Sequence, residues 1–191
     1  MIDGNFLDKK KIILDSFNKG KFEKVIKLAK KILKKNNDFQ ILYALSISFL
    51  TLKNYGEAEK FFRRIVSLKP NAENYYIYGN IQKQLKNYND ASKYFVEAVS
   101  LKPDYSEAYN NLGNTKLKLG LIDEAIENYK NAINSNKNNL QAYFNLAHLY
   151  NEEKNFNNLK KVLLDVLKLD ENNTTALNDL GYLNLILGNV D

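Results

Sequence analysis

Polar and aromatic side chains recur in this sequence at intervals of 33 or 34 residues. Three such series are Asn80, Asn114, His148 and Tyr182; Asn111, Asn145 and Asp179; and Tyr43, Tyr76, Asn110, Phe144 and Asn178. An asparagine carboxamide carries two donors and an acceptor, so it can bind the N–H and C=O groups of a peptide backbone without reading the peptide's sequence. A constant period would place these side chains at equivalent points of successive units, where a carboxamide could contact a polypeptide backbone.

Residues with catalytic or metal-binding chemistry are few. His148 is the single histidine, cysteine is absent, and the sequence has no glycine-rich phosphate loop or nucleophile motif. We therefore expect a protein that is not an enzyme and that uses no cofactor or metal ion. His148 is expected to make a polar contact with a ligand rather than act as a base. The acidic pairs Asp123–Glu124 and Glu152–Glu153 are expected to be solvated helix surface.

Composition narrows the class of protein further. The chain has 191 residues, of which 45% are hydrophobic, enough for a substantial core. No stretch reaches the roughly 18 apolar residues of a membrane span, and the start "MIDGNFLDKKK" does not resemble a secretory signal. The net charge of +6 resides in residues 1–38, with 11 lysines and 5 acids, so no basic stripe predicts nucleic-acid binding. We expect a cytoplasmic protein.

The elements that position these residues follow the same period. Pro70 and Pro103 lie 33 residues apart, each within "SLKP". Small or apolar residues form two further series: Val25, Ala58, Ala91, Ala125 and Leu159; and Ser46, Gly79, Gly113, Ala147 and Gly181. Each period contains two apolar runs of about 14 residues at helical spacing, separated by a short break. This pattern predicts a repeat array of eleven helices without strands.

The repeat resembles the tetratricopeptide repeat (TPR) family, a 34-residue helix–turn–helix unit. The family carries a large residue at position 4, Leu-Gly at 7 and 8, Ala at 20, an aromatic residue at 24, Ala at 27 and Pro at 32. Two units match best, with Tyr75, Gly79, Ala91, Phe95, Ala98 and Pro103 in one and Tyr109, Leu112, Gly113, Ala125, Tyr129 and Ala132 in the next. The resemblance implies an all-α, right-handed α-solenoid over residues 1–191. Its repeats would be 6–38, 39–71, 72–105, 106–139 and 140–173, followed by a half repeat, 174–191.

In the family the first helix of each repeat lines a concave groove, and positions 2, 5, 6, 9, 12 and 13 do not pack. The resemblance therefore implies that Asn110 and Asn111 point into a groove and are not core positions. The implied groove residues are Tyr76, Asn80, Asn110, Asn111, Asn114, Phe144, Asn145, His148, Asp179 and Tyr182. This arrangement resembles the asparagine ladder of O-GlcNAc-transferase-like arrays, which grips an extended polypeptide. The alternative is solvated asparagine in an asparagine-rich chain.

The expected function is that of a non-catalytic protein–protein interaction scaffold. A second binding mode of the family, the carboxylate clamp, uses lysine and arginine beside its asparagines. Here the asparagines match, but Tyr76, Gln141 and Asn145 occupy the positions of the cations. A charged C-terminal tail is therefore not the expected ligand.

Two surfaces outside the groove suggest other partners. The lysine-rich helix expected at 21–35 presents Lys24, Lys27, Lys31, Lys34 and Lys35 on one face. This face could bind an acidic partner or serve only as a solubilising cap.

The half repeat would expose Leu183, Leu185, Ile186, Leu187 and Val190. Such a face favours self-association through the C-terminal helix or continuation into a longer protein. In the second case the chain would be the N-terminal, substrate-presenting TPR region of an enzyme of the glycosyltransferase or sulfotransferase type.

Overall fold

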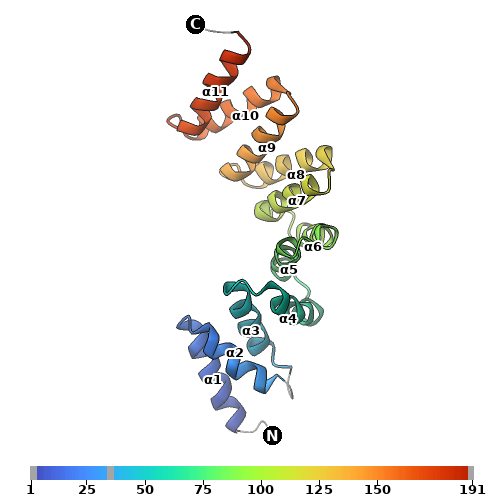
Figure 1. Ribbon diagram of the computed structural model, residues 1–191, viewed down its shortest axis with the longest axis vertical. Helices are drawn as coiled ribbons and strands as arrows, with labels where there is room; N and C mark the ends of the chain where they lie inside the picture. Colours follow the sequence, from blue (N-terminus) through green and yellow to red (C-terminus); the bar gives the residue numbers. More distant parts are fainter. Residues whose placement is uncertain (1–3, 34–36, 189–191) are drawn as a thin grey trace. The chain divides into compact units, whose positions relative to one another are not determined.

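The computed structural model describes residues 4–33 and 37–188, and these form eleven helices and no strand (Figure 1). The predicted all-α class is therefore confirmed. The helices are α1 (Gly4–Asn18), α2 (Phe22–Ile32), α3 (Phe39–Thr51), α4 (Tyr55–Leu68), α5 (Ala72–Gln84), α6 (Tyr88–Leu101), α7 (Ser106–Lys118), α8 (Ile122–Ser135), α9 (Leu140–Glu152), α10 (Phe156–Leu169) and α11 (Thr174–Ile186). None of the described helices is both long and apolar enough to cross a bilayer.

Many helices begin at a side-chain cap. The capping oxygen accepts a hydrogen bond from the backbone N–H three residues later, which satisfies a donor that the helix itself cannot pair. The capping residues are Asp38, Asn54, Asn71, Asn139, Asn155 and Asn173. Much of the periodic asparagine content therefore defines where helices start.

The turn after each odd-numbered helix contains one residue with a positive φ. These residues are Gly20, Lys53, Lys86, Gly120, Lys154 and Gly188, with φ between 55° and 75°. At Lys53, for example, the backbone N–H donates to Leu50 O at 3.0 Å, and the next N–H, of Asn54, donates to Phe49 O at 2.8 Å. This is the left-handed helix ending that glycine adopts most easily. Lysine occupies it in half of these turns.

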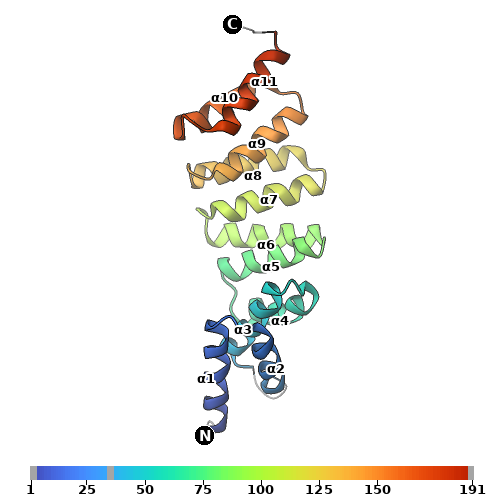
Figure 2. The same ribbon diagram turned by 60° about the vertical axis from the view of Figure 1, so that its left-hand side comes forward.

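The chain divides into two compact units, residues 1–101 with α1–α6 (unit 1) and residues 102–191 with α7–α11 (unit 2). Within each unit, consecutive helices pack against one another, and α1 also contacts α3 while α7 contacts α9. Figure 2 shows α5 beside α6 in unit 1 and α7 beside α8 in unit 2. The single solenoid over 1–191 stays a prediction.

Helix pairs are held together where an aromatic ring covers a glycine. A Cβ added to Gly113 would lie 2.6 Å from Tyr129 Cε1, and one added to Gly79 would lie 2.8 Å from Phe95. Both rings are buried, as is the alanine that precedes each by four residues. The predicted close approach of the two helices of a pair is therefore found in α5–α6 and in α7–α8.

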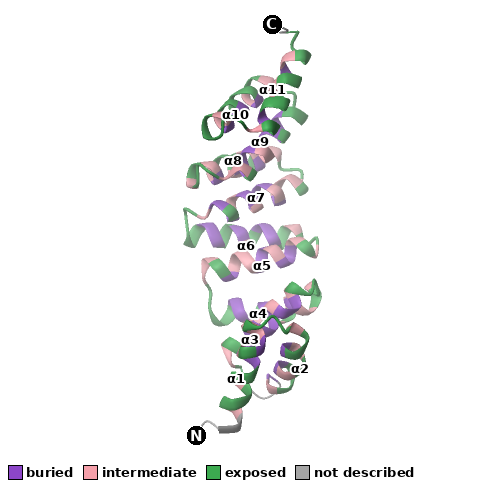
Figure 3. Cartoon of the chain, turned by 90° about the vertical axis from the view of Figure 1, so that its left-hand side faces the viewer, coloured by how far each residue is buried: buried purple, intermediate pink, exposed green. Residues whose placement is uncertain are grey.

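The C-terminal helix differs from its prediction at one position. Leu183 is only 1% exposed because it packs into the core of unit 2, so it is not part of an exposed apolar face. Leu185, Ile186 and Leu187 are exposed as predicted, and α11 is mostly green in Figure 3. Val190 lies outside the described residues.

The lysine face of α2 is exposed at Lys24, Lys27 and Lys31. Lys34 and Lys35 lie outside the described residues.

Replacing glycine by alanine should have different effects at two equivalent positions in unit 2. Both changes favour the helix by about 0.5–1 kcal/mol, but only at Gly113 does the new Cβ clash with a neighbour, because a Cβ at Gly181 meets nothing within 4 Å. We expect Gly113→Ala to be less stable than Gly181→Ala by about 1–3 kcal/mol in denaturant unfolding. Equal free energies of unfolding would show that the ring of Tyr129 moves aside without cost.

Candidate peptide-binding surface

Two predicted site residues of unit 2 join successive odd-numbered helices. Asn145 Nδ2 on α9 donates a hydrogen bond of 2.9 Å to Asn110 Oδ1 on α7. Asn145 Oδ1 in turn accepts from Gln141 Nε2 at 3.1 Å. The carboxamide of Asn145 is thus held at both ends, while its second N–H remains as a donor.

The prediction that Asn110 is not a core position is wrong. Its exposed fraction is 8%, and its amide lies against α9. The reason is that α7 and α9 contact each other directly, so the residue at this position meets the next repeat instead of solvent. Asn111, its neighbour, is half-buried.

Asn114 is held from within its own helix pair. The hydroxyl of Tyr129 on α8 donates a 2.8 Å hydrogen bond to Asn114 Oδ1. Burial raises the pKa of Tyr129 to about 12, so this hydroxyl keeps its proton at neutral pH. The bond leaves the amide donors of Asn114 for other partners.

These contacts overturn a further expectation for the groove asparagines. The family resemblance implies that the groove positions do not pack, but Asn114 and Asn145 both form hydrogen bonds to neighbouring helices. Both therefore contribute to folding as well as to any binding.

A hollow of about 290 Å³ lies in unit 2 between α9, α10 and α11. It gathers four predicted site residues, Phe144, His148, Asp179 and Tyr182. His148 and Tyr182 are largely exposed, and His148 Nε2 lies 3.3 Å from Glu152 Oε1. The other residues that line the hollow are Ala147, Asn151, Leu159, Thr175 and Leu183.

Asn151 and Thr175 were absent from the predicted site, although the sequence held a signal for both. They stand at positions 12 and 2 of their repeats, which the family resemblance names as unpacked. The repeat register does not reveal the three other lining residues, Ala147, Leu159 and Leu183, because each is buried and none stands at a position named as unpacked.

Tyr76 and Asn80 belong to unit 1, where both lie half-buried on α5. The ring centres of Tyr76 and Phe95 lie 6.0 Å apart. Asn80 Nδ2 donates a hydrogen bond of 3.1 Å to the backbone oxygen of Tyr76. Lys83, one turn further along, has its pKa lowered by burial, and its Nζ lies 5.9 Å from the centre of the Phe95 ring. Sequence reasoning did not include this cation.

Among the described residues, no group of three or more histidine, aspartate or glutamate side chains is placed to hold a metal ion. The described side chains of this surface offer hydrogen bonding by carboxamides, apolar and aromatic contact, and a few exposed charges.

The buried amide of Asn110 should matter for stability. Asn110→Ala removes the acceptor of Asn145 and should lower the free energy of unfolding by about 0.5–1.5 kcal/mol, the net value of one hydrogen bond. Asn178→Ala is the matched control, because Asn178 holds the same repeat position on α11 but is exposed. Its effect should stay within about 0.5 kcal/mol. Equal losses in urea unfolding would contradict the assigned role of Asn110.

The raised pKa of Tyr129 predicts that the protein loses stability at alkaline pH. Its pKa in the folded protein, about 12, lies above its ordinary value of 10.0, so the unfolded chain releases the proton first and stability falls as pH rises from 10 towards 12. Tyr129→Phe removes this contribution and should give a shallower fall over that range. Urea unfolding from pH 8 to 11 measures both curves, and parallel curves would contradict the prediction.

Family models of the tetratricopeptide repeat match residues 106–139, and 39–71 together with 140–173. A TPR repeat model matches residues 79–120. A TPR repeat-containing protein of Methanocaldococcus jannaschii is 30% identical over 161 residues, which make up 82% of this chain and 28% of that protein. The chain thus spans little more than a quarter of the length of this relative.

Three solved structures share the fold. The crystal structure of MamA protein has a TM-score of 0.79 at 25% identity, over 86% of this chain and 93% of that one. MamA 41-end from Desulfovibrio magneticus RS-1 reaches 0.80 at 19% identity, over 91% and 99%. YrrB, a TPR protein with an unusual peptide-binding site, reaches 0.76 at 18% identity, over 91% and 90%. With the helix pairs, the glycine–aromatic contacts and the matched repeats in agreement, the chain belongs to the tetratricopeptide repeat family.

Proposed function

We propose that this chain is a non-catalytic protein–protein interaction module, in which α7, α9 and α11 of unit 2 bind an extended peptide segment of a partner protein. The observation that carries the proposal is the pair of neighbouring residues Phe144 and Asn145 on α9. Asn145 forms the carboxamide pair with α7, while Phe144 lines the hollow towards α11. One helix, α9, therefore offers a peptide both a polar contact, at Asn145, and an apolar contact, at Phe144.

The carboxamides suit the backbone of a peptide. Asn145 and Asn114 are both held by neighbouring side chains, so little conformational freedom is lost when they bind. Each retains amide donors for peptide carbonyl groups. Such contacts do not depend on the peptide's sequence, and the hollow lined by Phe144, His148 and Tyr182 would supply the selectivity.

One comparison supports this function. The chain belongs to a repeat family represented among its structural neighbours by YrrB, a TPR protein with an unusual peptide-binding site. That likeness is one of fold, at 18% identity. On α5 of unit 1, Tyr76 and Asn80 hold the same repeat positions as Asn110 and Asn114.

The test begins with peptides of 12 residues selected from a random library against the 191-residue chain. Binding should be modest, with a Kd of about micromolar. Asn111→Ala/Asn145→Ala should weaken it by about tenfold, because each lost hydrogen bond is worth about 0.5–1.5 kcal/mol. Asn128→Ala/Asn157→Ala on α8 and α10 is the matched control and should bind like the unchanged chain.

Because Asn145 also bonds to Asn110, a second variant separates binding from folding. His148→Ala/Tyr182→Ala alters two largely exposed side chains of the hollow and should weaken binding with little change in thermal melting. Normal binding by both groove variants would refute the proposal. If Lys27→Ala/Lys31→Ala abolished binding in that case, the ligand would lie on the lysine face of α2.

A further inference from the structure

The hollow of unit 2 combines an acidic group with aromatic and apolar walls. Asp179 contributes an exposed carboxylate, Phe144 and Tyr182 contribute rings, and Leu159 and Leu183 are buried apolar residues at its base. Its volume of about 290 Å³ lies just below the range of about 300–1,000 Å³ that small-molecule sites occupy. The hollow is suited to one long side chain.

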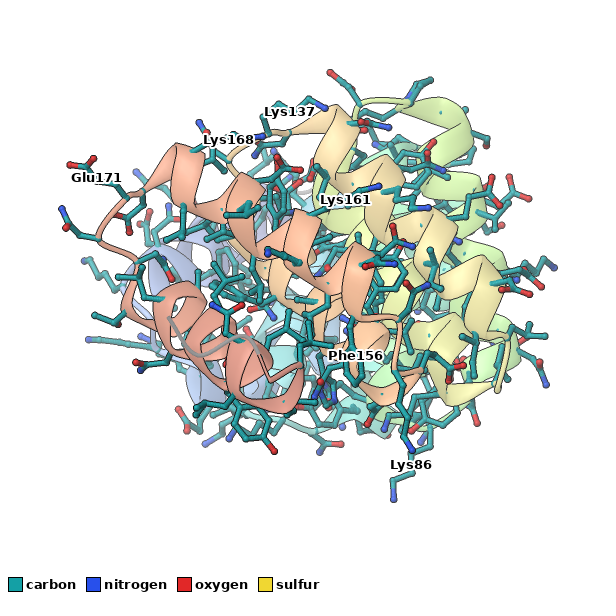
Figure 4. The ribbon with its side chains drawn as sticks, turned by 90° about the horizontal axis from the view of Figure 1, so that it is seen from above. Lys86, Lys137, Phe156, Lys161, Lys168 and Glu171 are labelled. Carbon is teal, nitrogen blue, oxygen red and sulfur yellow. The ribbon has the colours of Figure 1, made fainter. Side chains whose placement is uncertain are left out.

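Charge is unevenly divided around this hollow. Helices α9 and α11 contain Glu152 and Asp179 but no lysine or arginine. No lysine or arginine lines the hollow, and the one histidine in its lining, His148, lies 3.3 Å from Glu152. Lys161 and Lys168 on α10 and Lys137 in the turn after α8 line other hollows, and Figure 4 labels all three. A negative site thus occurs in a chain of net charge +6.

We propose that the hollow holds an arginine side chain of the bound peptide, which makes arginine the anchor residue that this module selects. The inference rests on the proposed function, since the arginine belongs to the same extended peptide. Its aliphatic stem would pack on Leu159 and Leu183, and its guanidinium group would pair with the carboxylate of Asp179. The planar guanidinium also stacks on aromatic rings, and Phe144 and Tyr182 offer two.

Other side chains match the hollow less well. A glutamate or aspartate would meet the like charge of Asp179, with Glu152 close by. An apolar side chain would fill the base but leave the carboxylate without a partner from the peptide. Lysine carries the required charge but is more strongly hydrated and does not form two parallel hydrogen bonds to a carboxylate, so it should be the weaker cation.

Matched synthetic peptides test the role of charge. In peptides selected from the random library, arginine should be enriched at one fixed position relative to the motif. Replacing it by citrulline keeps the shape and removes the charge, and should weaken binding to the unchanged chain about threefold to fivefold, as expected for an exposed ion pair. In Asp179→Asn the arginine and citrulline peptides should bind almost equally.

Asp123→Asn on α8 is the control for a general loss of negative charge, because Asp123 is exposed and does not line the hollow. This variant should still distinguish arginine from citrulline.

The results separate two kinds of failure. Selected peptides without an arginine preference, or equal binding of the arginine and citrulline peptides, would overturn the anchor while leaving peptide binding intact. Equal effects of Asp179→Asn and Asp123→Asn would overturn it too, because they would indicate only long-range attraction. If no peptide binds, both the proposed function and the anchor fail.

Discussion

The close approach of two helices within a pair is the constraint on which the rest of this structure depends. At Gly79 and Gly113 the partner helix brings an aromatic ring so near that even a methyl group would collide with it. Because the ring fills the space over the glycine, the two helices have little freedom to slide or rotate against each other. The residues on the remaining face of the odd-numbered helices are thereby fixed in direction. The hydrogen bond from Tyr129 to Asn114 shows the link directly, since the same ring that packs on Gly113 also holds a carboxamide of the candidate surface.

The sequence predicted the helices well because their signals are local and repeated. Small residues at a constant period, as at Gly79 and Gly113, have one simple steric explanation, and helical spacing defines the elements around them. The peptide-binding site itself stays a prediction. Phe144 and Tyr182, which the register assigns to the groove, lie in one hollow, whereas the burial of Asn110 could not be read from its repeat position. Whether that position is buried depends on what the following repeat presents, here Asn145, and Asn178 at the same position is exposed.

The abundance of asparagine has several physical explanations in this chain. Some asparagines start helices, as Asn139 and Asn173 do. Others join helices through their side chains, as Asn110 and Asn145 do. A third kind, represented by Asn178, is simply exposed. Composition alone cannot separate these roles because the carboxamide serves all of them with the same donors and acceptor. Only the position of each asparagine in the repeat, together with the residue that faces it, shows which role it has.

The turns with a positive φ bear on how such an array changes in length. All six turns share a similar positive φ. Three of them have glycine at this position (Gly20, Gly120 and Gly188), and three have lysine (Lys53, Lys86 and Lys154). A lysine in this conformation costs of order 1 kcal/mol relative to glycine, so the geometry is kept even where the side chain opposes it. Because these six turns have the same form, a gene segment encoding one whole period, cut within such turns, could be duplicated or deleted and the ends would still meet in a familiar turn. Recombination can therefore lengthen or shorten the protein one repeat at a time, without inventing a new connection.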